Sequence, residues 1–454
     1  MDHFEYLQDD LGQLPFLKSY SHLLLAFPLD ERAHSRDRVR QSLTAAALKI
    51  TQALPWLAGK VIQDEGLFKV QRCARWEPPH TIVRFRELDD RCASYDEIVQ
   101  ARGPISLLDG HLLAPRKAFP ESYEETEADP APVLAFQVNF IRGGLLVDCA
   151  AQHNLIDMSG IEQCYRLLAT ALRGEHFSTQ AIEQGNRDRR TIVPHLGPTE
   201  PMLDHRNFKR PSTPIPTPAE PASRFAWRYF RFSRTRLDQI KRLALPAVPS
   251  DNAAAADDVR YISTNDALSA FCWQRITAVR LRRRKEPGAP TKFCRAINGR
   301  AAMDVGPEYL GDLVSIAMSR FTSGELVDAP LSTVAQAMRR DLSTVNNRYY
   351  IRSFASFIAR EPDRSVISYG GAFNPDTDIG SSSWAHVQLH RVQFGVLGAP
   401  RLVRRPDFVP LKSDIYFMPQ TAEGDIDALL CFNQADFDGL AQDAEWTSSA
   451  ECIG

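Results

Sequence analysis

A proline-rich segment divides this chain of 454 residues into two halves. Within residues 184–222 few apolar residues occur, and the prolines are Pro194, Pro198, Pro201, Pro211, Pro214, Pro216, Pro218 and Pro221. Proline lacks a backbone donor for helices and sheets, so such a stretch favours an extended connection. The length also exceeds what one ordinary hydrophobic core supports. The sequence therefore predicts two domains, residues 1–190 and 223–454, joined by a crossover at 191–222.

Both halves mix strand-like and helix-like segments. In the first half the expected strands are 19–27, 60–62 and a hairpin of 133–141 with 145–153, and the expected helices are 38–54, 96–101 and 159–173. In the second half the expected strands are 224–232, 293–298, 383–390, 415–418 and 428–432. The expected helices there are 261–284, 331–359 and 437–444, with a surface loop at 253–258. Alternation of apolar residues and helical spacing support these assignments, which predict an α/β fold.

Composition excludes several function classes. The net charge of −2 gives no general attraction to nucleic acid or to anionic membranes. No run of eighteen apolar residues exists, and the acidic N-terminus lacks the apolar core of a signal peptide. The eight cysteines are scattered without CxxC spacing, which predicts free thiols in a cytoplasmic protein. His386 and His390 lie four residues apart without a third ligand, so no metal site is expected.

One short stretch, His153-Asn154-Leu155-Ile156-Asp157-Met158-Ser159-Gly160, is suited to catalysis. It joins a strand-like run to a helix-like run. A histidine at a strand end points into a cleft with a fixed backbone, and imidazole accepts protons near neutral pH. The alternative is a structural histidine followed by an Asp157 that only caps the next helix. HxxxD alone does not decide between them.

Other catalytic motifs are absent from the sequence. No GxGxxG lies between a strand and a helix, and no GxxxxGK[ST], HExxH or GxSxG occurs. A basic run that includes Arg283 and Arg284 ends the helix expected at 261–284. It either complements the helix dipole or contacts the phosphates of a cofactor.

Two elements in order across the chain resemble the BAHD acyltransferases. The first is HxxxD at His153, and the second is the DFGWG-like Phe394-Gly395-Val396-Leu397-Gly398-Ala399-Pro400. The segments Pro55–Gly59, Ser263–Phe271, Ser382–Ala385, Val403–Pro406 and Tyr416–Pro419 extend the similarity over nearly the whole chain. Taken together, they are most similar to the fungal trichothecene 3-O-acetyltransferases.

The resemblance implies two chloramphenicol-acetyltransferase-like domains with mixed sheets and an active-site tunnel between them. His153 would be the general base, Asp157 would fix the turn, and Gly160 would permit close packing at the helix start. Ser382, Ser383 and Trp384 would lie beside the active centre and the acyl-CoA. The expected reaction moves an acetyl group from acetyl-CoA to a hydroxyl of a sesquiterpenoid-like metabolite. The protein is expected to be a monomer with no bound cofactor.

The sequence departs from the family at one place. Gln393 stands where the DFGWG element has Asp, whose usual partner is an arginine, here expected to be Arg300. Gln393 would retain a hydrogen bond with Arg300 and lose the ion pair. Two alternatives on the same fold stay open. One is an N-acyltransferase or a carrier-protein-dependent condensation enzyme, although Gln152 replaces the first histidine of the HHxxxD typical of condensation domains. The other is a non-catalytic binding module.

Overall fold

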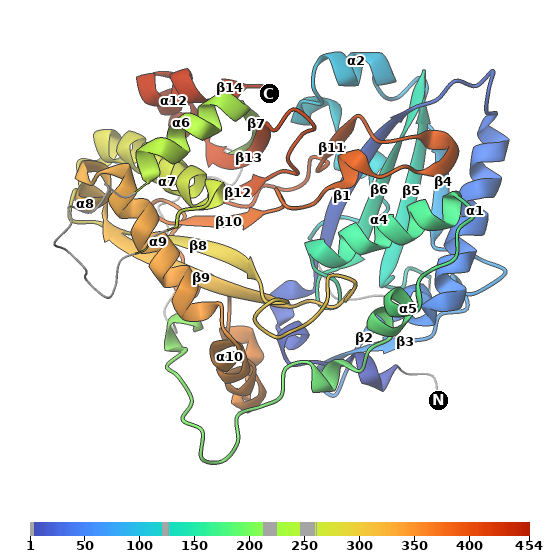
Figure 1. Cartoon of the computed structure of the whole chain (residues 1–454), viewed down its shortest axis with the longest axis horizontal. Helices are drawn as coiled ribbons and strands as arrows, with labels where there is room; N and C mark the ends of the chain where they lie inside the picture. The colour runs from blue at the N-terminus through green and yellow to red at the C-terminus, as the bar shows by residue number, and fades with distance from the viewer. Residues whose placement is uncertain (1–3, 120–125, 127, 212–224, 246–258, 260) are drawn as a thin grey trace.

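The computed structural model describes residues 4–119, 126, 128–211, 225–245, 259 and 261–454. It contains two sheet-based halves that lie side by side (Figure 1). The connection between them passes below both halves, through α5 (Thr179–Gly185) and the residues that follow it. The surface loop expected at 253–258 and part of the proline-rich segment lie outside the described residues.

The first sheet consists of five strands of mixed direction. Its order is β11 (Leu402–Arg404), β1 (Tyr20–Pro28), β6 (Gly144–Gln152), β5 (Leu134–Ile141) and β4 (Val83–Glu87). Strands β5 and β6 form the predicted hairpin, and only β4 and β5 run parallel. Helices α1 (Arg36–Ala53) and α4 (Met158–Leu172) lie together on one face of this sheet (Figure 1). The small elements of this half are β2 (Lys60–Asp64), β3 (Leu67–Gln71), α2 (Tyr95–Gln100) and α3 (Gly110–Leu113).

The second sheet has seven strands, again of mixed direction. Its order is β14 (Glu451–Cys452), β7 (Phe225–Phe232), β13 (Ile426–Asn433), β12 (Asp414–Phe417), β10 (Ile379–Ser383), β8 (Pro290–Asn298) and β9 (Val314–Thr322). The helices of this half are α6 (Arg234–Ala244), α7 (Thr264–Arg284), α8 (Ser323–Asp328), α9 (Leu331–Val345), α10 (Arg348–Arg360), α11 (Gln434–Ala441) and α12 (Ala444–Ser449). Helix α7 begins with a capping box in which Ser263 and Asp266 satisfy each other's backbone N–H groups, as the sequence signature indicates.

The two halves are tied together more closely than a simple linker predicts. Strand β11 comes from the second half of the chain and pairs with β1 of the first sheet. The crossover also packs on the second half, because Phe208 is buried against Phe354 with ring centroids 4.7 Å apart. The proline-rich segment is therefore partly a structural element of the second half.

Two sequence-based assignments were wrong. The strand expected at 383–390 ends at Ser383, because its neighbour β12 ends at Phe417 and offers no further ladder partner. The chain then turns, and Val387 donates its N–H to the carbonyl of Trp384. The helix expected at 331–359 is two helices, and Asn347 caps the second by accepting from the N–H of Tyr350.

Among the described residues, no helix is both long and apolar enough to cross a membrane.

Candidate active site

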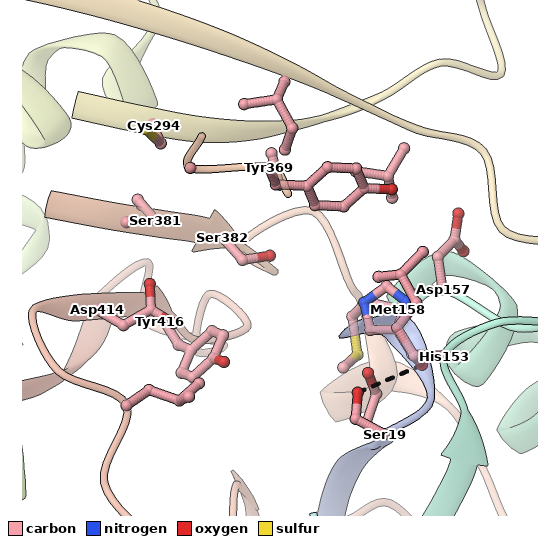
Figure 2. Close-up of a pocket in the computed structure, with 18 of the residues that line it drawn as sticks. Ser19, His153, Asp157, Met158, Cys294, Tyr369, Ser381, Ser382, Asp414 and Tyr416 are labelled. Carbon is pink, nitrogen blue, oxygen red and sulfur yellow. Dashed lines mark hydrogen bonds between the residues drawn. The ribbon is translucent and has the colours of Figure 1, made fainter. Parts of the chain in front are cut away.

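His153 directly follows strand β6, and its position is fixed by the neighbouring strand. Its backbone N–H donates to the carbonyl of Ser19, just before β1, over 2.8 Å (Figure 2). The side chain is 27% exposed, while the residues of β6 before it are buried. The sheet therefore holds one partly exposed imidazole at the end of β6, as the sequence predicts.

Asp157 holds the turn after His153 and does not contact its ring. The carboxylate caps α4 by accepting from the N–H of Gly160 over 2.9 Å, and it also accepts from the N–H of Leu313 over 3.1 Å. Arg300 donates to both carboxylate oxygens, over 2.6 and 2.9 Å. Burial alone would raise the pKa of Asp157, but Arg300 and the two N–H donors hold it below its usual range. In Figure 2 this carboxylate points away from the cavity.

The carboxylate that faces the imidazole is Asp312. One of its oxygens lies 3.4 Å from Nδ1 of His153, and its side chain is fully buried. Burial lowers the pKa of His153, but Asp312 outweighs this and the net shift is upward. Burial likewise raises the pKa of Asp312, with His153 opposing the shift. A contact of this length is longer than a good hydrogen bond.

Asp312 is the site residue that sequence reasoning missed. It lies in Leu310-Gly311-Asp312-Leu313, between β8 and β9, in the other half of the chain. No local motif surrounds it, and only the fold brings it to His153. With Nδ1 turned toward Asp312, the other ring nitrogen of His153, Nε2, remains available to a ligand.

His153 opens into a cavity of about 470 Å³ between the two sheets. The wall on its side includes Ser19–His22, Asp157, Met158 and Ser159, and the opposite wall includes Ser381–Trp384, Asp414 and Tyr416. Figure 2 shows Ser19, His153 and Met158 on one side and Ser381, Ser382, Asp414 and Tyr416 on the other. Such a space, lined by both apolar and polar side chains, is typical of a site for small molecules.

The expected residues at 382–384 all line this cavity. Trp384 donates its indole N–H to the hydroxyl oxygen of Ser382 over 2.9 Å. This bond uses the Trp384 donor and leaves the hydroxyl hydrogen of Ser382 free for a ligand. Ser382 is therefore better suited than Trp384 to stabilise an oxyanion.

The expected phosphate contacts at Arg283 and Arg284 do not reach the cavity. Arg283 is 2.8 Å from Asp436, and Arg284 is 3.1 Å from Asp376. Both charges already have carboxylate partners, and neither residue is part of the cavity wall. The geometry favours the structural alternative, a basic helix terminus.

Comparison with known proteins identifies the family. Residues 19–172 match the trichothecene 3-O-acetyltransferase-like N-terminal domain, and residues 112–447 match the transferase family. The chain belongs to this family of BAHD acyltransferases. It is an acyl-CoA-dependent O-acyltransferase.

Individual relatives cover nearly the whole chain. The chain is 48% identical to O-acyltransferase pigD of Monascus ruber, over 98% of each sequence. It is 33% identical to trichothecene 3-O-acetyltransferase TRI101 of Fusarium sporotrichioides, over 99% of this chain and 98% of the relative. The crystal structure of F. graminearum TRI101 with ethyl coenzyme A superimposes with a TM-score of 0.89, at 31% identity and 98% coverage of both chains. These matches confirm the expected fold.

The DFGWG-like element of this BAHD enzyme packs against the first sheet and α4, but the predicted contact between Gln393 and Arg300 was wrong. Arg300 is engaged by Asp157, whereas Gln393 is exposed and its carbonyl accepts from Arg173 over 2.7 Å. Phe394 is buried and packs edge-on against Phe27, with centroids 5.1 Å apart. The loss of the family Asp at 393 therefore leaves the Arg300 ion pair intact.

Gly160 permits close packing, as expected, and Gly395 meets a second steric demand. A Cβ on Gly160 would lie 2.3 Å from the carbonyl oxygen of Leu310. Gly395 has a φ of +59°, and a Cβ there would lie 2.7 Å from the carbonyl oxygen of Leu172, at the end of α4. Gly398 also has a positive φ, of +69°, in the turn that closes the element. Gly160 thus allows Leu310 to approach the first turn of α4, and Gly395 allows close contact with its last residue.

Proposed function

We propose that this enzyme acetylates a hydroxyl of a sesquiterpenoid-like secondary metabolite, with acetyl-CoA as donor and His153 as general base. The observation that carries the proposal is the partly exposed imidazole of His153 at the cavity wall, backed by the buried carboxylate of Asp312. The relatives add support, because F. graminearum TRI101 was crystallised with coenzyme A and T-2 mycotoxin, and with coenzyme A and deoxynivalenol.

The chemistry follows from the available atoms. Nε2 of His153 removes the proton of the acceptor hydroxyl while the hydroxyl oxygen attacks the thioester carbonyl carbon. Asp312 stabilises the resulting imidazolium at Nδ1. The hydroxyl of Ser382 donates to the oxyanion of the tetrahedral intermediate. The intermediate collapses, the C–S bond breaks, and His153 returns the proton to the departing thiolate of coenzyme A.

Each group has one task in this scheme. Ser383 and Trp384 help to shape the wall against which the donor lies, and Asp157 with Arg300 keeps the turn of His153 in place. General-base assistance contributes about 10²–10⁴-fold, and alignment of the two substrates supplies much of the remainder. The protein acts as a cytoplasmic monomer in this proposal.

The test begins with calorimetric titration of acetyl-CoA and longer acyl-CoAs, followed by an acceptor screen that includes deoxynivalenol. We expect His153→Ala to bind acetyl-CoA like the wild type and to lose turnover by at least about 100-fold. Turnover that survives this substitution with the accepted substrate would refute His153 as the base. Failure of every acyl-CoA to bind would refute the donor.

A further inference from the structure

One buried arginine in the cavity wall has no partner of opposite charge. Arg405 is 3% exposed, yet among the described residues no carboxylate lies within ion-pair distance of it. The one side-chain hydrogen bond that it makes within the described part of the chain is a long contact of 3.5 Å from Nη1 to the carbonyl of Pro406. The adjacent Arg404 differs, because it lies 2.8 Å from Asp427. Burying an unpaired guanidinium costs free energy of folding, so a role other than ion pairing is needed to explain Arg405 at this position.

Aromatic rings hold this guanidinium in place. Its carbon lies 4.8 Å from the ring centre of Trp227, 5.0 Å from that of Phe408 and 5.3 Å from that of Tyr416. Cation–π contacts of this kind stabilise the charge without using its N–H donors. A guanidinium has five N–H groups, and most of those of Arg405, which lines the cavity, have no hydrogen-bond acceptor among the described residues.

The same rings connect Arg405 with the reaction centre. Tyr416 stacks on Trp227 with a centroid distance of 5.5 Å, and its ring lies tilted against that of Trp384 at 4.7 Å. Trp384 in turn donates to Ser382, the proposed oxyanion donor. Tyr416, Trp384, Ser382 and Arg405 all line the cavity, so a rigid ligand that lies along Tyr416 would have one end near Ser382 and the other end at Arg405.

Neighbouring charges indicate what Arg405 binds. The carboxylates of Asp148, Asp407 and Asp414 each experience the field of Arg405 without touching it. Burial raises the pKa of Asp414 to about 6, so this group is still mostly ionised at neutral pH. A phosphate or carboxylate placed at Arg405 would be repelled by the ionised carboxylate of Asp414, which lies in the same cavity wall. A neutral carbonyl oxygen can accept hydrogen bonds from the free N–H groups of Arg405 without this charge repulsion.

We infer that Arg405 forms an acceptor subsite that recognises a carbonyl oxygen. Building on the proposed function, the acceptor is a hydroxylated metabolite whose reacting hydroxyl lies at His153 and whose ketone, ester or lactone carbonyl lies at Arg405. In this proposal the subsite is separate from the donor, because the carboxylate of Asp414 disfavours the phosphates of acetyl-CoA.

The test uses two probes that differ only at the carbonyl: androsterone, a rigid polycyclic hydroxyketone, and the diol produced by reducing its ketone. Binding is followed by tryptophan fluorescence, since Trp227 and Trp384 flank the subsite. We expect the wild type to bind the hydroxyketone about tenfold or more tightly than the diol, as for a hydrogen bond to a charged group. Equal binding, or binding of neither probe, would overturn the inference.

Arg405→Met removes the donors and keeps much of the volume. We expect it to weaken hydroxyketone binding to the level of the diol, with diol and acetyl-CoA binding unchanged. Its thermal midpoint should be equal to or above that of the wild type, because an unpaired buried charge is lost. Arg401→Met, at an exposed position of the same segment, is the matched control and should keep the preference.

A loss of acetyl-CoA affinity in Arg405→Met would instead assign Arg405 to the donor and overturn the inference. The two proposals fail separately. If the wild type binds acetyl-CoA but does not prefer the hydroxyketone, only the subsite is refuted. If it prefers the hydroxyketone but binds no acyl-CoA, only the proposed donor chemistry is refuted.

Discussion

At the scale of single residues, two carboxylates near His153 have different tasks. Asp157 is ion-paired with Arg300 and holds the turn, whereas Asp312 lies 3.4 Å from Nδ1 and influences the proton affinity of the ring. The sequence predicted that His153 ends a strand and opens into a cleft and that Asp157 holds the turn, since both follow from one local motif. It did not predict Asp312 or the partner of Arg300, because contacts between the two halves leave no local pattern.

Asp312→Asn should change the pH dependence of catalysis. His153 must be neutral to accept a proton, and Asp312 is the main group that raises its pKa. Without that charge, burial remains to lower the pKa, so the acidic limb of the kcat/KM profile should move to lower pH. The value of kcat should fall by about 10- to 100-fold, because the ring loses its orienting partner and becomes a weaker base.

The measurement is a pH–rate profile of both proteins. Asp304→Asn removes an exposed carboxylate from the same connection between strands and should leave the profile unchanged. An acidic limb that stays in place in Asp312→Asn would show that Asp312 does not act on His153.

At the scale of elements, the DFGWG-like turn supports α4. Gly395→Ala should lower the free energy of unfolding by about 1–3 kcal/mol, because a φ of +59° favours glycine and the new Cβ would clash with the Leu172 carbonyl. Gln393→Asp restores the residue typical of the family, but it is exposed and should change stability by less than about 0.5 kcal/mol. Chemical denaturation measures both. A larger effect at Gln393 than at Gly395 would contradict this account.

Element prediction succeeded where local signals and tertiary contacts agree. The hairpin of β5 and β6 follows from alternation and a Gly-Gly turn, and α7 follows from its capping box. The strand assigned to 383–390 failed because strand length depends on the partner, and β12 ends at Phe417. The helix assigned to 331–359 failed because Asn347 starts a new helix.

At the scale of the whole molecule, the active site exists only where the two halves meet. His153 comes from the first sheet, and Ser382, Tyr416 and Asp312 come from the second half. The proline-rich segment predicted two domains, but not the exchange of β11 into the first sheet. A ligand in this cavity contacts both halves and stabilises them together.

Acetyl-CoA should therefore raise the thermal midpoint of unfolding. At about 100 times its dissociation constant, a ligand bound only by the folded state adds about 2.7 kcal/mol to the free energy of unfolding. His153→Ala should show the same increase, because the base acts on the acceptor and contributes little to donor binding. Differential scanning calorimetry at several acetyl-CoA concentrations measures the effect. A rise in the wild type that disappears in His153→Ala would mean that His153 holds the donor, and its assignment as the base would then rest on geometry alone. No rise in either protein would mean that acetyl-CoA does not bind between the halves.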